Sequence, residues 1–246
     1  NQNHTNVYQP YTIWSRKPYQ GSLINIDAEG NRVTLHNSSR DDALEVWLLG
    51  GSTVWGTGVP DDQTIASHLA SLLNGRWGID ARVRNLGESA YVSTQEAVYL
   101  LLQLQKDVPD VVIFYDGVND AGASALWPEI PGTHHNIQVF RDALGGESPT
   151  VNKKRDALAV LVRSTGLYRV ARKALSLVGV EYSKAPGVAT TGVVGVDQPE
   201  STELQLGEQV INIWLHNFRI VGALGQEYGF VPIFIYQPTL TVGEKP

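Results

Sequence analysis

The sequence has neither cysteine nor methionine among its 246 residues. Without cysteine there is no disulfide scaffold and no zinc or iron–sulfur site with thiolate ligands. Lysine and arginine number 19 against 25 aspartates and glutamates, and the net charge of −6 argues against nucleic acid as a partner. No apolar run approaches the roughly 18 residues of a membrane-spanning helix. Because 42% of the residues are hydrophobic and 18% are charged, the chain can bury a core, which indicates a globular fold.

Methionine is missing even at position 1, so we expect the chain to begin after a removed segment or to be a piece of a longer protein. Two triplets, at Asn3 and Asn37, have the Asn-x-Ser/Thr pattern of N-glycosylation. These features predict an extracytoplasmic or secreted protein and make it a candidate glycoprotein. The sequence gives no indication of an oligomeric state.

The chain divides into an N-terminal extension, residues 1–42, and a main domain, residues 43–246. In the extension, residues 22–27 and 32–35 alternate between polar and apolar types and are predicted to pair as a hairpin. In the main domain, residues 121–200 break the regular pattern, and we interpret them as an insertion of the lid type. The insertion contains a Pro/Gly-rich loop at 128–132, a basic amphipathic helix near 157–177 and a Gly/Val/Thr-rich stretch at 187–196.

Short apolar runs alternate with amphipathic stretches through the rest of the main domain. The apolar runs predict buried strands at 43–49, 111–115 and 231–236, and we interpret 82–86, which Gly87 ends, as a further strand. The amphipathic stretches predict helices at 64–74, 93–105 and 203–228. Ser93 and Glu96 have the spacing of a capping box at the start of the second helix. This alternation predicts a three-layer α/β/α sandwich with a mostly parallel sheet, of the flavodoxin-like kind.

Three consecutive strand ends carry groups suited to acyl transfer. The first reads Gly-Gly-Ser-Thr and contains Ser52, the second reads Asn-Leu-Gly and ends at Gly87, and the third reads Asp-Gly-Val-Asn-Asp and contains Asn119. Ligands of such sheets bind beyond the carboxyl ends of the strands, where these groups are expected to meet. Acyl transfer needs a nucleophilic hydroxyl and N–H donors aimed at the developing oxyanion. The Ser52 and Gly87 amides and the Asn119 side chain would supply such donors.

These three blocks, in this order, resemble those of the SGNH (GDSL-like) hydrolase family. The resemblance covers residues 44–120 well and extends loosely to residues 236–238, with Gly-Gly-Ser-Thr standing where the family has Gly-Asp-Ser-Leu. It implies that Ser52 is the nucleophile and that Gly87 and Asn119 complete the oxyanion hole. It also implies an acyl hydrolase fold of the SGNH type.

One part of the family pattern is missing. The resemblance implies a general base on a histidine three residues after an aspartate, beyond a fifth strand, and no Asp-x-x-His occurs in this sequence. None of the six histidines replaces it convincingly, and His134 and His135 are expected in an exposed loop. A serine without a base is a poor nucleophile at neutral pH. We therefore expect the given chain to lack the last strand and helix of the fold, with a catalytically dead member as the alternative.

Each candidate residue also has a purely structural interpretation. Ser52 would serve as a helix cap, Gly87 as a turn glycine, and Asn119 with Asp120 as an Asx turn. We assign Asp120 to structure. Trp55 and Tyr91 belong either to the substrate edge or to the core. No metal is expected, because Asp116 and Asp120 have no further ligand cluster beside them, and no cofactor is implied.

Two functions from different classes follow. The first is a serine esterase or acyl hydrolase with a Ser52, Gly87 and Asn119 oxyanion hole, or an acyltransferase of the same chemistry. Its substrate is a small-molecule or glycan ester, with acetylated glycans favoured by the expected location. The alternative is a non-catalytic SGNH-like module that binds glycan or forms part of an extracellular assembly.

Overall fold

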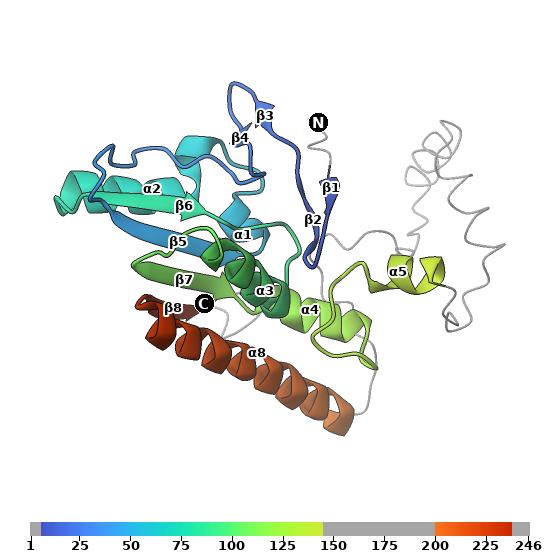
Figure 1. Ribbon diagram of the computed structural model, residues 1–246. Helices are drawn as coiled ribbons and strands as arrows, with labels where there is room; N and C mark the ends of the chain where they lie inside the picture. The colour runs from blue at the N-terminus through green and yellow to red at the C-terminus, as the bar shows by residue number, and fades with distance from the viewer. Residues whose placement is uncertain (1–5, 145–199, 238–246) are drawn as a thin grey trace, which may run out of the picture. The chain divides into compact units, whose positions relative to one another are not determined.

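The computed structural model describes residues 6–144 and 200–237 (Figure 1). The chain falls into two compact units. One consists of Asn1–His135 with Gln198–Pro246, and the other of Asn136–Asp197. The described part of the second unit contains one helix, α5 (Ile137–Ala143). All other elements below belong to the first unit.

A parallel sheet of four strands forms the centre of the first unit. Its order is β6-β5-β7-β8, and all three neighbouring pairs are parallel. The strands are β5 (Leu44–Gly50), β6 (Ala81–Asn85), β7 (Val111–Asp116) and β8 (Val231–Tyr236). Each lies within about two residues of its predicted range, and the predicted α/β fold with a mostly parallel sheet is confirmed.

Helices cover both faces of this sheet (Figure 1). They are α1 (Ser52–Trp55), α2 (Ile65–Ser71), α3 (Ser93–Leu104), α4 (Val118–Leu126) and α8 (Glu200–Tyr228). Trp47, Leu49 and Phe114 face the cluster that includes α3 and α8. Val46 and Leu48 face the cluster that includes α2. This period-two alternation of buried residues explains why β5 reads as a continuous apolar run and confirms the three layers.

The predicted helices form, with differences in how α2 ends and how α3 is capped. The helix predicted at 64–74 begins at Ile65, after Thr64 as N-cap, and its end is a π turn, η2 (Leu72–Arg76). In α3 the N-cap is Val92, and its N–H donates a hydrogen bond to Oε1 of Gln95 at 3.3 Å. Ser93 therefore does not form the predicted capping box with Glu96. Its hydroxyl donates instead to Asp120, which is 27 residues further along the chain.

The N-terminal extension contains a hairpin of β1 (Asn6–Gln9) and β2 (Ile13–Arg16), which the sequence did not predict, followed by the short pair β3 (Tyr19–Gln20) and β4 (Asn25–Ile26). The hairpin predicted between residues 22–27 and 32–35 forms in a shorter version. Ile26 is bridged antiparallel to Arg32, and the Asp27 and Val33 N–H groups donate to the backbone oxygens of Asn31 and Asn25, at 2.9 and 3.0 Å.

The predicted insertion is described only in part. Its first residues form α4 and the loop that follows it, whereas the helix predicted at 157–177 and the stretch at 187–196 lie outside the described residues. Within the described ranges, no helix is both long and apolar enough to cross a membrane. Within the same ranges, no strand pairs with the outer side of β8.

Candidate active site at the carboxyl edge of the sheet

The first and third strand ends meet at Gly51 and Asn119. Gly51 is the N-cap of α1, so Ser52 begins this helix directly after β5 and is half-buried. A Cβ atom on Gly51 would lie 2.3 Å from Asn119 Nδ2. Only glycine can therefore occupy position 51 while the Asn119 amide stays beside the backbone that carries Ser52.

Asn119 is held in the first turn of α4. Its Nδ2 donates to the backbone oxygen of Tyr91 at 2.7 Å. The preceding Gly117 has a φ of +106°, and a Cβ there would lie 2.6 Å from the ring of Tyr236 on β8. The Asn119 side chain is thus oriented by its bond to the loop before α3, and Gly117, at the start of its turn, packs against the end of β8.

The second strand end approaches α1 just as closely. A Cβ on Gly87 would lie 2.6 Å from the backbone nitrogen of Trp55, so only glycine fits at position 87 without a shift of α1. The Gly87 N–H donates to Asn85 Oδ1 at 3.1 Å, and Asn85 Nδ2 donates to the backbone oxygen of Val54 at 2.8 Å. To act on a substrate oxyanion, the Gly87 amide would have to exchange its bond with Asn85 for one to the substrate.

The loop between Gly87 and α3 is tied to the N-terminal hairpin, which sequence reasoning missed. Arg16 Nε donates to both oxygens of Glu88, at 2.9 and 3.1 Å, and Trp14 Nε1 donates to Ser89 O at 3.1 Å. The Tyr91 hydroxyl donates to the backbone oxygen of Trp14. These partners are 72 to 77 residues apart in sequence, so no local pattern could have revealed them.

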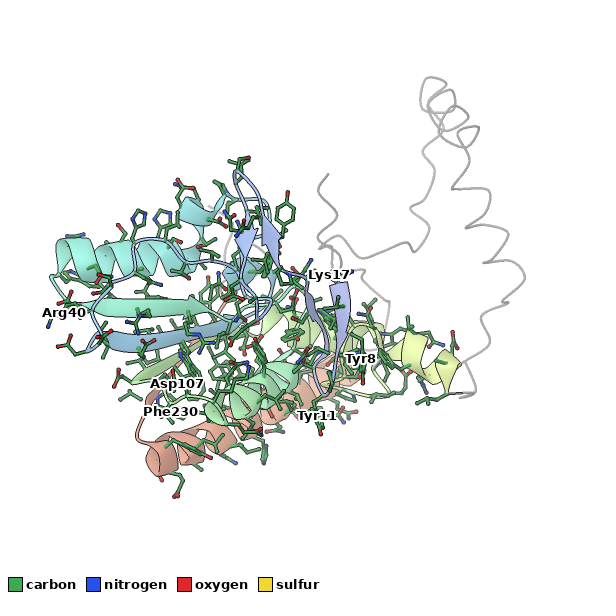
Figure 2. The ribbon with its side chains drawn as sticks, turned by 45° about the horizontal axis from the view of Figure 1, so that its top comes forward. Tyr8, Tyr11, Lys17, Arg40, Asp107 and Phe230 are labelled. Atoms are coloured by element: carbon green, nitrogen blue, oxygen red, sulfur yellow. The ribbon has the colours of Figure 1, made fainter. Side chains whose placement is uncertain are left out.

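The same hairpin exposes its other side. The side chains of Tyr8 and Tyr11 are 72% and 76% exposed, and Figure 2 labels both, with Lys17 just beyond the hairpin. Trp55 and Tyr91, in contrast, are buried, which places both in the core rather than along an open substrate edge.

Three carboxyl groups are buried behind the Asp116–Asp120 turn. Asp120 accepts from the Ser93 N–H at 3.1 Å and from its hydroxyl at 2.5 Å. Asp116 Oδ1 accepts from Trp214 Nε1 at 2.5 Å. Glu96 is fully buried, and no N–H or hydroxyl of the described residues reaches its two oxygens or Asp116 Oδ2.

The carboxyl groups of Glu96 and Asp116 are close enough for each to affect the pKa of the other. Burial, followed by the negative charge of Asp116, raises the pKa of Glu96 well above its usual value. Burial also raises the pKa of Asp116 to about 6, against the opposing hydrogen bonds from Glu96 and Trp214. Burial therefore favours the protonated form of Glu96 beside Asp116.

The paired histidines do not lie in an open loop as predicted. His134 and His135 are both half-buried, and the His134 ring lies 6.1 Å from that of Trp14 in an edge-on contact. Burial lowers the pKa of both, and a hydrogen bond to the backbone of Asn119 partly opposes this for His135. Nδ1 of His216 on α8 is hydrogen-bonded to the backbone oxygen of Asn212 at 2.6 Å. Among the described residues, no group of three or more histidines or carboxylates is arranged to hold a metal ion.

A cavity of about 420 Å³ opens beside Ser52. One wall is the α1 turn with Thr53 and Thr57, and the other is formed by Val59, Gln63 and Ile65. The candidate nucleophile thus lies at the edge of a space large enough for part of a small ligand.

Comparison with known proteins gave no matching family model and no matching curated protein. Among solved structures, the chain is similar to AlinE4, an SGNH-hydrolase family esterase, with 26% identity over 34% of this chain and 44% of that one, at a TM-score of 0.30. It is also similar to a member of the lipolytic protein G-D-S-L family from Veillonella parvula DSM 2008, with 15% identity over 79% of each chain, at a TM-score of 0.31. The structural neighbours are SGNH and GDSL proteins. The match to AlinE4 spans less than half of that esterase.

Proposed function

We propose that the protein is a serine acyl hydrolase with Ser52 as its nucleophile. The observation that carries this proposal is the contact between Gly51 and the Asn119 amide, which sets an N–H donor next to the residue that begins α1. A hydroxyl beside a positioned amide, at the carboxyl edge of a parallel sheet, is the arrangement that acyl transfer needs.

In the proposed reaction, the Ser52 oxygen attacks the ester carbonyl carbon and loses its proton to a base. The carbonyl oxygen becomes an oxyanion, which the Ser52 amide and Asn119 side chain stabilise, with Gly87 joining once its amide leaves Asn85. The C–O bond to the alcohol then breaks, and the alcohol takes up a proton. Water hydrolyses the resulting acyl-serine and releases the acid. Transfer to a sugar hydroxyl instead of water would make the same site an acyltransferase.

The test is hydrolysis of p-nitrophenyl acetate by the full-length protein. We expect Ser52→Ala to lose activity by at least about a thousandfold. Ser71→Ala, which changes an exposed serine on α2, is the matched control and should keep full activity. Equal activity in both variants would contradict the assignment of Ser52.

A second candidate function has one observation in its favour. The Gly87 N–H already donates a hydrogen bond to Asn85 Oδ1, so it is not free to bind an oxyanion. This sheet edge therefore also suits a non-catalytic SGNH-like module that binds glycan or takes part in an extracellular assembly. An inactive full-length protein that binds a glycan array, with binding unaffected by Ser52→Ala, would favour this alternative.

We further propose an extracytoplasmic or secreted location and, within it, acetylated glycans as candidate substrates. The support is the Asn-x-Ser/Thr triplets at Asn3 and Asn37. Fractionation of the source cells followed by detection of the native protein tests the location. Recovery only with the cytoplasmic fraction would contradict it.

A further inference from the structure

We propose that two side chains of α8, Trp214 and Asn217, are positioning residues that hold the Asn119 amide in place for the reaction. This inference rests on the proposed function, in which the Asn119 amide stabilises the oxyanion. The helix α8 packs against both α3 and α4 (Figure 1). Because Trp214 and Asn217 are three residues apart on α8, their side chains lie on the same side of the helix.

The first contact of α8 is with Asp116, the last residue of β7, which lies three residues before Asn119. Trp214 Nε1 donates to Asp116 Oδ1 at 2.5 Å, whereas no N–H group of the described residues reaches Asp116 Oδ2. The Asp116 side chain is buried, and a buried carboxyl group without a donor is costly. Loss of the indole N–H should therefore allow the end of β7 to move toward water.

The Trp214 ring also supports the residue that follows Asp116. A Cβ on Gly117 would lie 2.6 Å from the ring of Tyr236, so the backbone of this turn is packed tightly against that ring. The Tyr236 ring in turn lies 6.0 Å from the Trp214 ring, in an edge-on contact. The start of α4 is thus fixed on one side by a hydrogen bond and on the other by aromatic packing.

The second contact of α8 reaches Asp120, the residue directly after Asn119, through one intermediate. Asn217 Nδ2 donates to Ser93 Oγ at 2.9 Å and to Thr94 Oγ1 at 3.0 Å. The Ser93 hydroxyl donates to Asp120 at 2.5 Å, and the Ser93 N–H does so at 3.1 Å. A hydroxyl that accepts from an amide has its own proton free to donate, so Asn217 orients the Ser93 proton toward Asp120.

The two contacts enclose Asn119 between Asp116 and Asp120. The Asn119 Nδ2 carries two N–H groups, of which one is donated to the Tyr91 oxygen, so the other remains for an oxyanion. Such a donor stabilises the transition state only when it is already held in the required position. Because neither α8 side chain lines the cavity beside Ser52, both act through the Asn119 turn and not through substrate.

The first test is hydrolysis of p-nitrophenyl acetate by variants of the full-length protein. Trp214→Phe keeps an aromatic ring but removes the N–H, and we expect kcat to fall by about tenfold or more while KM changes less. Asn217→Ala should act in the same way. The matched controls are Trp77→Phe, at a 57% exposed position, and Asn212→Ala, at an exposed position of α8, and both should keep the wild-type kcat. Unchanged kcat in folded Trp214→Phe and Asn217→Ala would overturn the proposal.

The second test asks whether the loss occurs through Asn119. In the Asn119→Ala background the amide is absent, so Trp214→Phe should lower kcat/KM by less than about twofold further. A tryptophan that only stabilises the fold would cost the same factor with or without Asn119. Losses that multiply would therefore overturn the positioning role and leave the hydrolase proposal standing.

The third test does not depend on activity. Hydrogen exchange followed by mass spectrometry should show the peptide that contains residues 116–120 exchanging at least about tenfold faster in Trp214→Phe than in the wild type. The same peptide should be unchanged in Trp77→Phe. Unchanged exchange in Trp214→Phe, in a wild type that hydrolyses esters, would overturn this proposal alone. A full-length wild type that hydrolyses no ester would overturn it together with the proposed function.

Discussion

At the scale of single residues, the contact between Gly51 and Asn119 determines whether the candidate site is assembled. A methyl group at position 51 would lie 2.3 Å from Asn119 Nδ2, and the amide would have to move. Asn119 would then also lose its bond to the Tyr91 carbonyl, which now holds it at 2.7 Å. Both contacts act on the amide proposed to stabilise the oxyanion.

We therefore predict that Gly51→Ala lowers kcat/KM by about a hundredfold or more, the usual loss for one oxyanion donor. The free energy of unfolding should fall by only about 1–3 kcal/mol, as for other overpacked positions. Steady-state kinetics and urea denaturation measure the two effects. Gly75→Ala is the control, because a Cβ at position 75 contacts nothing within 4 Å. Full activity in Gly51→Ala would show that Asn119 is not needed where we place it.

Glu96 determines how stability depends on pH. Its pKa is raised above the unfolded value by burial and by Asp116, with Asp120 adding to the effect, so the folded state holds a proton that the unfolded chain releases. Stability from this proton is fully present below about pH 4.3, the ordinary glutamate value. It is lost as the pH rises toward the folded pKa. Asp116 acts in the same direction up to pH about 6.

We predict that Glu96→Gln removes much of this loss, because a neutral amide can donate to Asp116 at every pH. The stability of the variant relative to the wild type should therefore increase between pH 5 and pH 8, by about 1–3 kcal/mol. Urea denaturation at the two pH values measures the change. A difference that stays constant with pH would mean that Glu96 and Asp116 do not share a proton.

At the scale of elements, the N-terminal hairpin β1–β2 supports the site through the loop before α3. The Arg16 side chain donates to Glu88, and burial raises the pKa of Glu88 although the charge of Arg16 partly opposes this. The Tyr91 hydroxyl joins the same loop to the backbone of Trp14. The backbone oxygen of Tyr91 in turn accepts a hydrogen bond from the side-chain amide of Asn119. The extension thus supports the loop that holds Asn119 and does not only cap the domain.

We predict that Arg16→Ala lowers kcat by about tenfold, because a loosened loop misplaces the Asn119 amide. KM should change less than kcat, since Arg16 does not line the cavity. Arg16→Lys should restore activity in part, as it keeps the charge but loses the two-pronged contact. Tyr8→Ala, at a 72% exposed position on the same hairpin, is the control. A lower melting temperature with unchanged kcat would reduce Arg16 to a structural role.

The elements differ in how far the sequence alone could predict them. The four sheet strands were predictable because β5, β7 and β8 are short apolar runs, and β6 alternates between buried and half-buried residues just before Gly87. The cap of α3 was not, because the acceptor for Ser93 is Asp120, which only the tertiary fold brings near. The hairpin predicted in residues 22–35 forms only near its turn, where Asp27 accepts from the Glu29 and Asn31 amides.

The candidate site shows the same limit. The location of Ser52, Gly87 and Asn119 along one sheet edge could be predicted because each follows a strand of the parallel sheet. The space beside Ser52 could not, because Arg32, which donates to the backbone oxygens of Trp55, Gly56 and Val59, pairs with Asp61 across 29 residues with no local signal. His134 and His135 were misjudged because their burial depends on packing against Trp14 and Asn119.

At the scale of the whole molecule, the parallel sheet places the two glycine-rich strand ends and the Asn119 turn along one edge, with a hydrophobic cluster on each face. The central claim is that Ser52 is the nucleophile at this edge. Reaction of the full-length protein with a fluorophosphonate, followed by peptide mass spectrometry, tests it most directly. We expect a phosphonyl adduct on the peptide containing Ser52 and no adduct in Ser52→Ala. Labelling that persists in Ser52→Ala would contradict it.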